Sequence, residues 1–244
     1  MRLGALVLVA LALTGCETTA QKSAKLERAA KRLAAGRQAT PAATAVTHPS
    51  SIVRVVRASL IRSSEGAAAI VTLRNASSKA LTDLPIAITV KDAAGRTLFQ
   101  NNATGLEAAL VSVPSLAPHA TVTWVDDQIP AGAGGPGAGT VIARVGESRA
   151  RAKSIPRLPV TGLHLIEDPT NGIGASGVVT NGSATSQRSL VVFVLATRGG
   201  VIVAAGRAVV PEAPAHSARP FTVFFIGDPH GTRLQATAAV SPSI

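Results

Sequence analysis

Apolar and polar residues alternate with a period of two along most of the chain beyond residue 50. In residues 84–91, Ile86, Ile88 and Val90 alternate with smaller or polar residues, and residues 92–95 (DAAG) then supply turn formers. This pattern predicts a half-buried strand that enters a hairpin. Similar runs, separated by turn residues roughly every ten positions, occur at residues 53–56, 69–74, 110–113, 120–125 and 140–145. Strands at this spacing, without convincing helices, predict an all-β sandwich.

The second half of the sequence repeats the order of features in the first. Residues 69–78 (AIVTLRNASS) align with residues 175–184 (ASGVVTNGSA), which places Asn75 and Asn181 at equivalent positions 106 residues apart. The same offset aligns residues 84–95 with 190–201, and later residues 116–130 resemble 212–229. We therefore predict two tandem immunoglobulin-like β-sandwiches, residues 51–150 and 155–244, joined by a linker at residues 151–154.

The N-terminal residues have the layout of a secretory signal. Met1 and Arg2 precede an uncharged apolar run of eleven residues, 3–13, which is too short for a membrane span of about 20 residues. The Leu13-Thr14-Gly15-Cys16 segment that follows resembles the bacterial lipobox. This resemblance implies cleavage of a signal peptide, residues 1–15, and attachment of lipid to the Cys16 sulfur. An ordinary secretory signal with an incidental cysteine is the alternative, and we favour lipidation because Cys16 is the only cysteine in the chain.

Resemblance to bacterial lipoproteins also implies a location. Acyl chains such as palmitate on Cys16 hold a mature chain stably at a membrane when more than one chain is attached. The protein is then extracytoplasmic, on the periplasmic or surface face of the cell membrane or the outer membrane. Glu17 replaces the aspartate that retains proteobacterial lipoproteins at the inner membrane, so it permits export to an outer membrane.

Residues 16–50 form a basic tether between the lipid and the first sandwich. Residues 22–35 are rich in helix formers and precede Gly36, which predicts a helix that ends there. Residues 38–51 have the composition of a flexible spacer. Anionic head groups attract each nearby basic residue by about 1 kcal/mol, so the tether's cations are candidate lipid contacts. A solvated helix face explains the same charges equally well. The residues concerned are Lys22, Lys25, Arg28, Lys31 and Arg32.

A second resemblance concerns only the C-terminal copy. Residues 193–197 (FVLAT) are similar to the signature of the FxLYD-type immunoglobulin-like domains that are appended to bacterial lipoproteins. Ala196 and Thr197 stand where that signature has Tyr and Asp, and the first copy lacks the signature. The resemblance implies an extracytoplasmic module and no chemistry of its own.

The candidate chemical groups are few and scattered. Asp126, Asp127 and Asp228 are predicted to occupy equivalent loops, but they offer too few oxygen ligands for a calcium site. Trp124 is either an exposed contact or a core residue; we favour the core, with Phe224 or Phe225 as its counterpart. The five histidines are His48, His119, His164, His216 and His230, and none has the spacing of a metal-ligand motif. We predict that His119 and His216 lie in matching turns of the two halves.

These features favour binding over catalysis. The sequence offers no nucleophile motif, metal site or cofactor cradle, so we predict no enzyme activity, no cofactor, and Cys16 as the only site residue. A net charge of +11 raises the possibility of nucleic-acid binding, but the chain has no Tyr, one Trp and a secretion signal, which exclude it. We expect a structural or protein-interaction module of the cell envelope. The alternative is a ligand-binding or accessory subunit of an envelope transport or assembly system, with a groove between the sandwiches.

Overall fold

The computed structural model describes residues 46, 48–64, 66–103, 105–133, 138–148, 150–151 and 155–240. All of them belong to one compact unit, Thr40–Ile244. The predicted signal peptide, Cys16 and the tether as far as residue 45 lie outside the described residues. So do residues 134–137 of the glycine-rich segment and residues 152–154 of the predicted linker.

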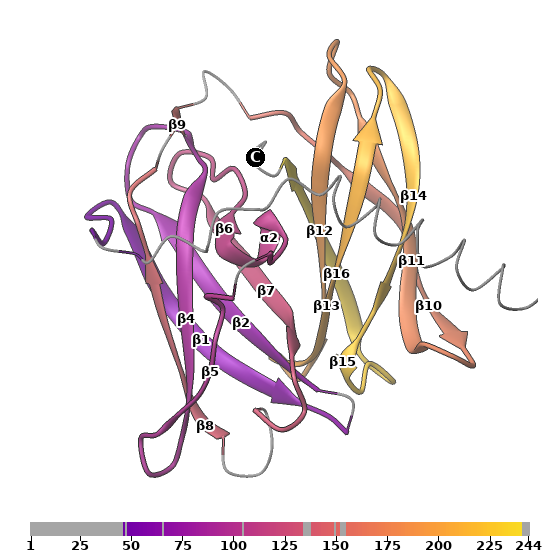
Figure 1. Cartoon of the computed structure of the whole chain (residues 1–244). Helices are drawn as coiled ribbons and strands as arrows, with labels where there is room; N and C mark the ends of the chain where they lie inside the picture. Colours follow the sequence, from indigo (N-terminus) through magenta and orange to yellow (C-terminus); the bar gives the residue numbers. More distant parts are fainter. Residues whose placement is uncertain are drawn as a thin grey trace, which may run out of the picture. The chain divides into compact units, whose positions relative to one another are not determined.

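The described part of the chain is almost entirely β strand, which confirms the predicted all-β fold (Figure 1). The strands of the first half are β1 (Val53–Arg62), β2 (Ala67–Asn75), β3 (Leu81–Thr82), β4 (Leu84–Asp92), β5 (Thr97–Gln100), β6 (Ser112–Val113), β7 (Thr121–Ile129), β8 (Ala138–Val145) and β9 (Ala150–Arg151). Those of the second half are β10 (Val160–Asp168), β11 (Gly172–Asn181), β12 (Gln187–Arg198), β13 (Val201–Ala213), β14 (Ser217–Phe224), β15 (Ile226–Gly227) and β16 (Arg233–Val240).

Each half contains two main antiparallel sheets. In the first half, β1, β2 and β7 form one sheet, while β4 pairs with β5, β6 and β8 in the other. In the second half, β10, β11 and β14 form one sheet, and the order β15-β13-β12-β16 forms the other. Among the described strands, every ladder joins partners from the same half. Separate folding of the two halves as domains stays a prediction.

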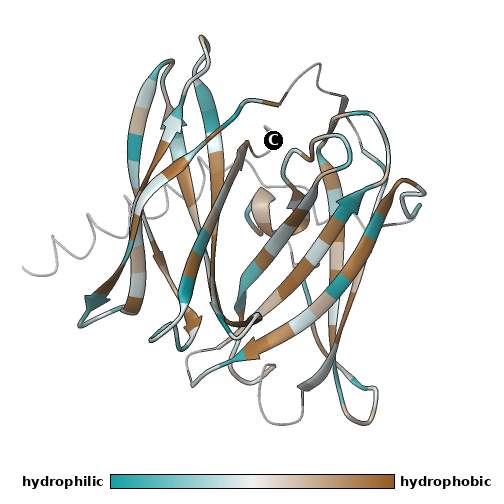
Figure 2. Ribbon diagram, turned by 180° about the vertical axis from the view of Figure 1, so that it is seen from behind, coloured by the Kyte–Doolittle hydropathy of each residue, from teal (hydrophilic) through white to brown (hydrophobic). Residues whose placement is uncertain are grey.

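The predicted alternation is clearest in β4. Ile86, Ile88 and Val90 are buried, and the residues between them are only half-buried. The predicted turn follows, because the backbone N–H and Nε of Arg96 donate to the two carboxylate oxygens of Asp92, at 2.8 and 2.7 Å. Gly95 adopts a φ of 81°, in the left-handed region that glycine tolerates without steric cost. Figure 2 shows the same banding of apolar and polar residues along the strands.

Asn75 and Asn181, which the sequence alignment of the two halves places at equivalent positions, make matching hydrogen bonds; Asn75 is fully buried at the end of β2. Its Nδ2 donates to the carbonyl oxygens of Lys79 at 2.7 Å and Ala117 at 3.0 Å. Its Oδ1 accepts hydrogen bonds from both the backbone N–H and the hydroxyl of Ser77. This one side chain thus bonds to backbone groups of two loops that have no partner in a sheet. These bonds hold the corner of the sandwich together.

Asn181, at the end of β11, makes the equivalent bonds. Its Nδ2 donates at 2.9 Å to the carbonyls of Thr185 and Pro214, and its Oδ1 accepts from the N–H and hydroxyl of Ser183. The turns that complete the two corners contain His119 and His216, with φ of 55° and 51°. The prediction that these histidines occupy matching turns is therefore confirmed.

Two details of the predicted strands are wrong. Residues 110–113 do not form one strand: a short helix, α2 (Ala108–Val111), precedes β6, and its turn brings the Ala109 carbonyl to 2.9 Å from Trp124 Nε1. Trp124 is fully buried, as predicted. Its counterpart, however, is Phe221 and not Phe224 or Phe225: Trp124 pairs with Val71, and Phe221 pairs with Gly177, which lies 106 residues after Val71. Within the described residues, no helix is both long and apolar enough to cross a membrane.

The two halves share part of one core. Buried residues of β12 alternate between two clusters: Val192 and Val194 belong to the core of the second half, whereas Val191 and Phe193 join the core of the first. Correspondingly, all residues from Ala67 to Val71 of β2 are buried, on both faces of the strand. The outward face of the sheet β1-β2-β7 is thus covered by β12 and β13.

Candidate functional site

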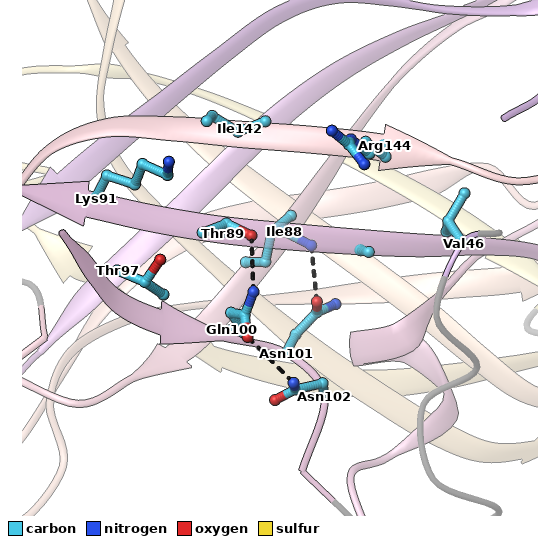
Figure 3. Close-up of a pocket in the computed structure, with 11 residues that line it drawn as sticks. Val46, Ile88, Thr89, Lys91, Thr97, Gln100, Asn101, Asn102, Ile142 and Arg144 are labelled. Atoms are coloured by element: carbon cyan, nitrogen blue, oxygen red, sulfur yellow. Dashed lines mark hydrogen bonds between the residues drawn. The ribbon is translucent and has the colours of Figure 1, made fainter. Parts of the chain in front are cut away.

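A groove of about 400 Å³ lies on the outward face of the sheet formed by β5, β4 and β8 (Figure 3). Its floor comes from β4, one side from β8 and the other from β5 and the residues that follow it. Val46, at the start of the described chain, lies at one end. The side chains that define its chemistry are Thr89, Lys91, Gln100, Asn102, Ile142 and Arg144.

The hollow results from small residues in the middle of a face with longer residues around it. Ala87 and Thr89 point outward because their neighbours Ile86, Ile88 and Val90 point into the core. On β8, the residues opposite Ala87 and Thr89 are Arg144 and Ile142. These longer side chains rise beside the short ones, so the sheet surface is lowest along β4.

A chain of side-chain hydrogen bonds forms the β5 side of the groove. Asn102 Nδ2 donates to Gln100 Oε1 at 3.2 Å, and Gln100 Nε2 donates to Thr89 Oγ1 at 3.3 Å (Figure 3). Both amide residues are exposed. The chain holds two amide side chains at the rim, where they can offer donors and acceptors to a polar ligand.

Asn101 supports the floor from below and is itself buried, with 2% of its surface exposed. Its Oδ1 accepts from the N–H of Ile88 at 2.7 Å, and its Nδ2 donates to the carbonyls of Ile86 at 3.0 Å and Leu110 at 2.7 Å. The Ile88 N–H and the Ile86 carbonyl lie on β4 between the part of the strand that pairs with β6 and the part that pairs with β5. Asn101 therefore replaces missing ladder bonds and keeps the groove floor in place.

The electrostatic character of the groove is positive. Neither Lys91 nor Arg144 has an ion-pair partner among the described residues. No described lining residue carries a carboxylate. Some other cations are paired, for example Arg96 with Asp92 on the same hairpin, whereas others, such as Arg188 and Arg233, are exposed and have no ion-pair partner among the described residues. Unpaired cations beside an amide-lined hollow are suited to an anionic ligand.

The residues singled out from the sequence lie elsewhere. Cys16 and the basic residues of the tether are outside the described part of the chain, so lipid attachment and head-group contact stay predictions. His230 is exposed, and its backbone N–H donates to Asp228 Oδ1 at 3.0 Å, while its Nδ1 lies 2.7 Å from the same oxygen. The backbone hydrogen bond, followed by the side-chain contact, lowers the pKa of Asp228. Within the described residues, no group of three or more His, Cys, Asp or Glu could hold a metal ion.

The predicted loop position of Asp126 and Asp127 is wrong, because both residues lie within β7. Asp126 points into the core of the first half, and burial raises its pKa to about 6. Asp127 points the other way, toward the second half, and burial raises its pKa too. Asp228 does follow β15 in a loop, so these carboxylates are not equivalent.

Asp127 instead forms part of a contact between the halves. The backbone N–H of Arg207 on β13 donates to Asp127 Oδ2 at 2.8 Å, and Arg207 Nε lies 3.4 Å from Asp127 Oδ1. Arg207 Nη1 also donates to Glu107 Oε2 at 2.8 Å. The arginine side chain is only 3% exposed. These ion pairs and the surrounding apolar residues make this region a packed contact.

Comparison of the sequence with protein-family models and with curated proteins gave no match. The functional argument therefore rests on the residues of this chain. Sequence reasoning did not predict the groove, since its cations and amides come from three strands. One signal was present: the outward positions of β4 carry Ala87, Thr89 and Lys91, whereas the aligned positions of β12 carry Phe193, Leu195 and Thr197.

Proposed function

We propose that the protein is a lipid-anchored, extracytoplasmic module of the bacterial cell envelope that acts by binding another macromolecule. Lipid on Cys16 holds it at the membrane, and residues 16–50 give the folded part reach from the surface. The lipobox-like segment and the apolar run before it support the anchor. The all-β architecture suits a rigid binding module, since sheets present fixed surfaces to partners.

The observation that carries the binding role is the groove on the β5-β4-β8 face. Its lining supplies cationic, amide and hydroxyl groups, which can hold a charged or polar ligand in a defined orientation. We infer that the module is not an enzyme because this lining contains neither a nucleophile beside a base nor an acid–base pair. Its immunoglobulin-like, tandem character belongs to the same proposal, supported by the matching corners at Asn75 and Asn181.

The alternative, a transport or assembly subunit that holds its ligand between the two sandwiches, has less support. The region between the halves contains Phe193 and Ala205, both buried in the core cluster of the first half. Arg207 fills a further part of it with its two ion pairs. Side chains already occupy the space that a ligand would need.

Two measurements in cells test the proposal. Labelled fatty acid should enter the wild type and not Cys16→Ser, which should leave the membrane fraction. A photoreactive side chain at the groove rim, at Asn102, should capture a discrete envelope protein, whereas one at the exposed Arg233 on β16 should not. Equal labelling of both proteins would refute the anchor, and identical capture patterns from the two positions would refute a binding role for the groove.

A further inference from the structure

The groove-bearing face has an equivalent in the second half, and that equivalent is already a docking surface. At the offset of 106 residues, Ala87 and Thr89 of β4 correspond to Phe193 and Leu195 of β12. Phe193 is buried in the shared core cluster, and Leu195 packs against it. This face of β12 therefore receives the sheet β1-β2-β7. The aligned face of β4 has the same outward orientation but no covering sheet among the described residues.

The two faces differ in chemistry, and the difference indicates what each can bind. The β12 face presents large apolar side chains, which suit another apolar sheet. The β4 face substitutes small and polar residues and adds the unpaired cations Lys91 and Arg144. Burial of this face against an apolar sheet would strip water from both charges without compensation, which is costly. A partner must therefore bring negative charge.

The two cations are arranged along the groove. Lys91 is on β4, and Arg144 lies opposite Ala87, four positions earlier on the same strand. With about 3.3 Å per residue, the two positions are about 13 Å apart along the strand. Figure 3 shows the two side chains at well-separated positions along the sheet. One phosphate or one carboxylate cannot contact both, but an extended chain with acidic residues at positions i and i+4 matches the spacing.

We propose that the groove binds an extended acidic segment of a partner protein, with carboxylates at positions i and i+4 against Lys91 and Arg144. The intervening residues lie over Thr89 and beside Ile142, and the amides of Gln100 and Asn102 bond to the segment's backbone. This inference rests on the proposed function, since it names the kind of partner that the module binds.

A peptide fits the hollow better than other anions do. Thr89 on β4 and Ile142 opposite it on β8 lie between the levels of the two cations, so Ile142 offers apolar contact to a side chain between the two acids. The amides at the rim match peptide N–H and C=O groups. A flat membrane surface would leave the floor uncontacted, and a free phosphate would use only one cation.

The test uses the full-length purified protein and capped synthetic peptides with measured affinities. The probe has the order Glu-Thr-Val-Thr-Glu. Its controls are Gln-Thr-Val-Thr-Gln, which has no charge, and Glu-Glu-Thr-Val-Thr, which has the same composition with adjacent acids. The protein variants are the double substitution Lys91→Gln with Arg144→Gln, and a charge-matched control, Arg188→Gln with Arg233→Gln, at exposed positions outside the groove.

We expect the probe to bind more tightly than both control peptides. The groove double variant should lose about fivefold in affinity or more, as expected for two partly exposed ion pairs, and the charge-matched variant should lose much less. Unchanged melting temperatures would show that the variants remain folded. Equal losses in both variants, equal affinity for the three peptides, or no binding of any peptide would each overturn the inference.

Further measurements distinguish an acidic peptide from other possible ligands of the groove, and they distinguish failure of this inference from failure of the proposed function. Tighter, groove-dependent binding of inorganic phosphate or of phosphatidylglycerol vesicles would identify a phosphate ligand instead, and concentration-dependent dimers lost in the groove variant would identify a second copy of this chain. Failure of the peptide with intact fatty-acid labelling and capture at Asn102 would refute only the ligand class. Failure of labelling with peptide binding intact would refute only the anchor.

Discussion

Arg207 is the side chain whose removal should most clearly weaken the contact between the two halves. It is nearly buried, and it faces Asp127, whose side chain is 14% exposed, and Glu107, whose side chain is 57% exposed. Replacement by methionine keeps the apolar contacts of the aliphatic part of the side chain but removes the guanidinium group and its charge. Asp127 then keeps only the backbone N–H of Arg207 as a partner from the second half. Removing one member of a buried ion pair typically costs 3–5 kcal/mol.

We therefore expect Arg207→Met to lower the free energy of unfolding by about 3 kcal/mol, the smaller end of that range because the backbone bond to Asp127 persists. Glu107→Gln should cost less than about 1 kcal/mol, because an exposed ion pair contributes little. Adding Asp127→Asn to Arg207→Met should recover part of the loss, with a coupling of about 1–3 kcal/mol, since the uncompensated charge disappears.

Urea unfolding of the full chain measures these changes. Trp124 is the only tryptophan, and it is buried in the first half, so its fluorescence reports unfolding there. Circular dichroism reports the strands of both halves. Coincident transitions from the two probes would show that the halves unfold together. The reasoning fails if Arg207→Met costs no more than Glu107→Gln, or if the double variant shows simple additivity.

Three further substitutions test individual elements by the same unfolding measurements. Asn75→Ala should cost about 3 kcal/mol because it leaves buried backbone carbonyls unsatisfied, whereas Asn102→Ala should cost less than about 0.5 kcal/mol. The folded-state pKa of Asp126, about 6, exceeds its usual 3.8, so the folded protein binds this proton more tightly and loses stability as pH rises from about 3 to 7. Asp126→Asn should reduce that loss by about 3 kcal/mol. Gly227→Ala should cost more than about 2 kcal/mol, because a Cβ there would lie 2.3 Å from the Val203 carbonyl oxygen, while Gly182→Ala, in open space, should change little.

The strands were predicted best from the sequence where one face of the strand is buried and the other is accessible to solvent. The alternation in residues 84–91 gave both the strand and the buried residues correctly, since period two is the direct consequence of a sheet with one apolar face. The repeat was found through Asn75 and Asn181, whose corners need an amide of that length in both halves. The prediction failed at residues 110–113 (LVSV), because so short a segment, apolar except for Ser112, fits a helical turn as well as a strand.

The chemical predictions depended on tertiary contacts that spacing does not encode. Asp126 and Asp127 resemble loop residues by composition, yet β7 continues through them because Arg207, 80 residues later, offers Asp127 a partner. The counterpart of Trp124 was misplaced because the aromatic residues of residues 221–225 were aligned by their cluster and not by strand register. The groove needed the pairing of β4 with β5 and β8, which no single segment reveals.

The contact between the halves accounts for the difference in residues between the aligned strands β4 and β12. Residues 67–71 (AAAIV) and 190–194 (LVVFV) are apolar without alternation, and continuous apolar runs are typical of strands covered on both faces. β2 is covered on one face by the other sheet of the first half and on the other face by β12, so the first half contributes its β1-β2-β7 sheet to the contact and the second half contributes its β12-β13 sheet. The other main sheet of each half consequently faces outward. The β4 face therefore carries Ala87, Thr89 and Lys91 where the aligned positions of β12 carry Phe193, Leu195 and Thr197, and it does so without loss of core packing, as the charged binding surface that we propose requires.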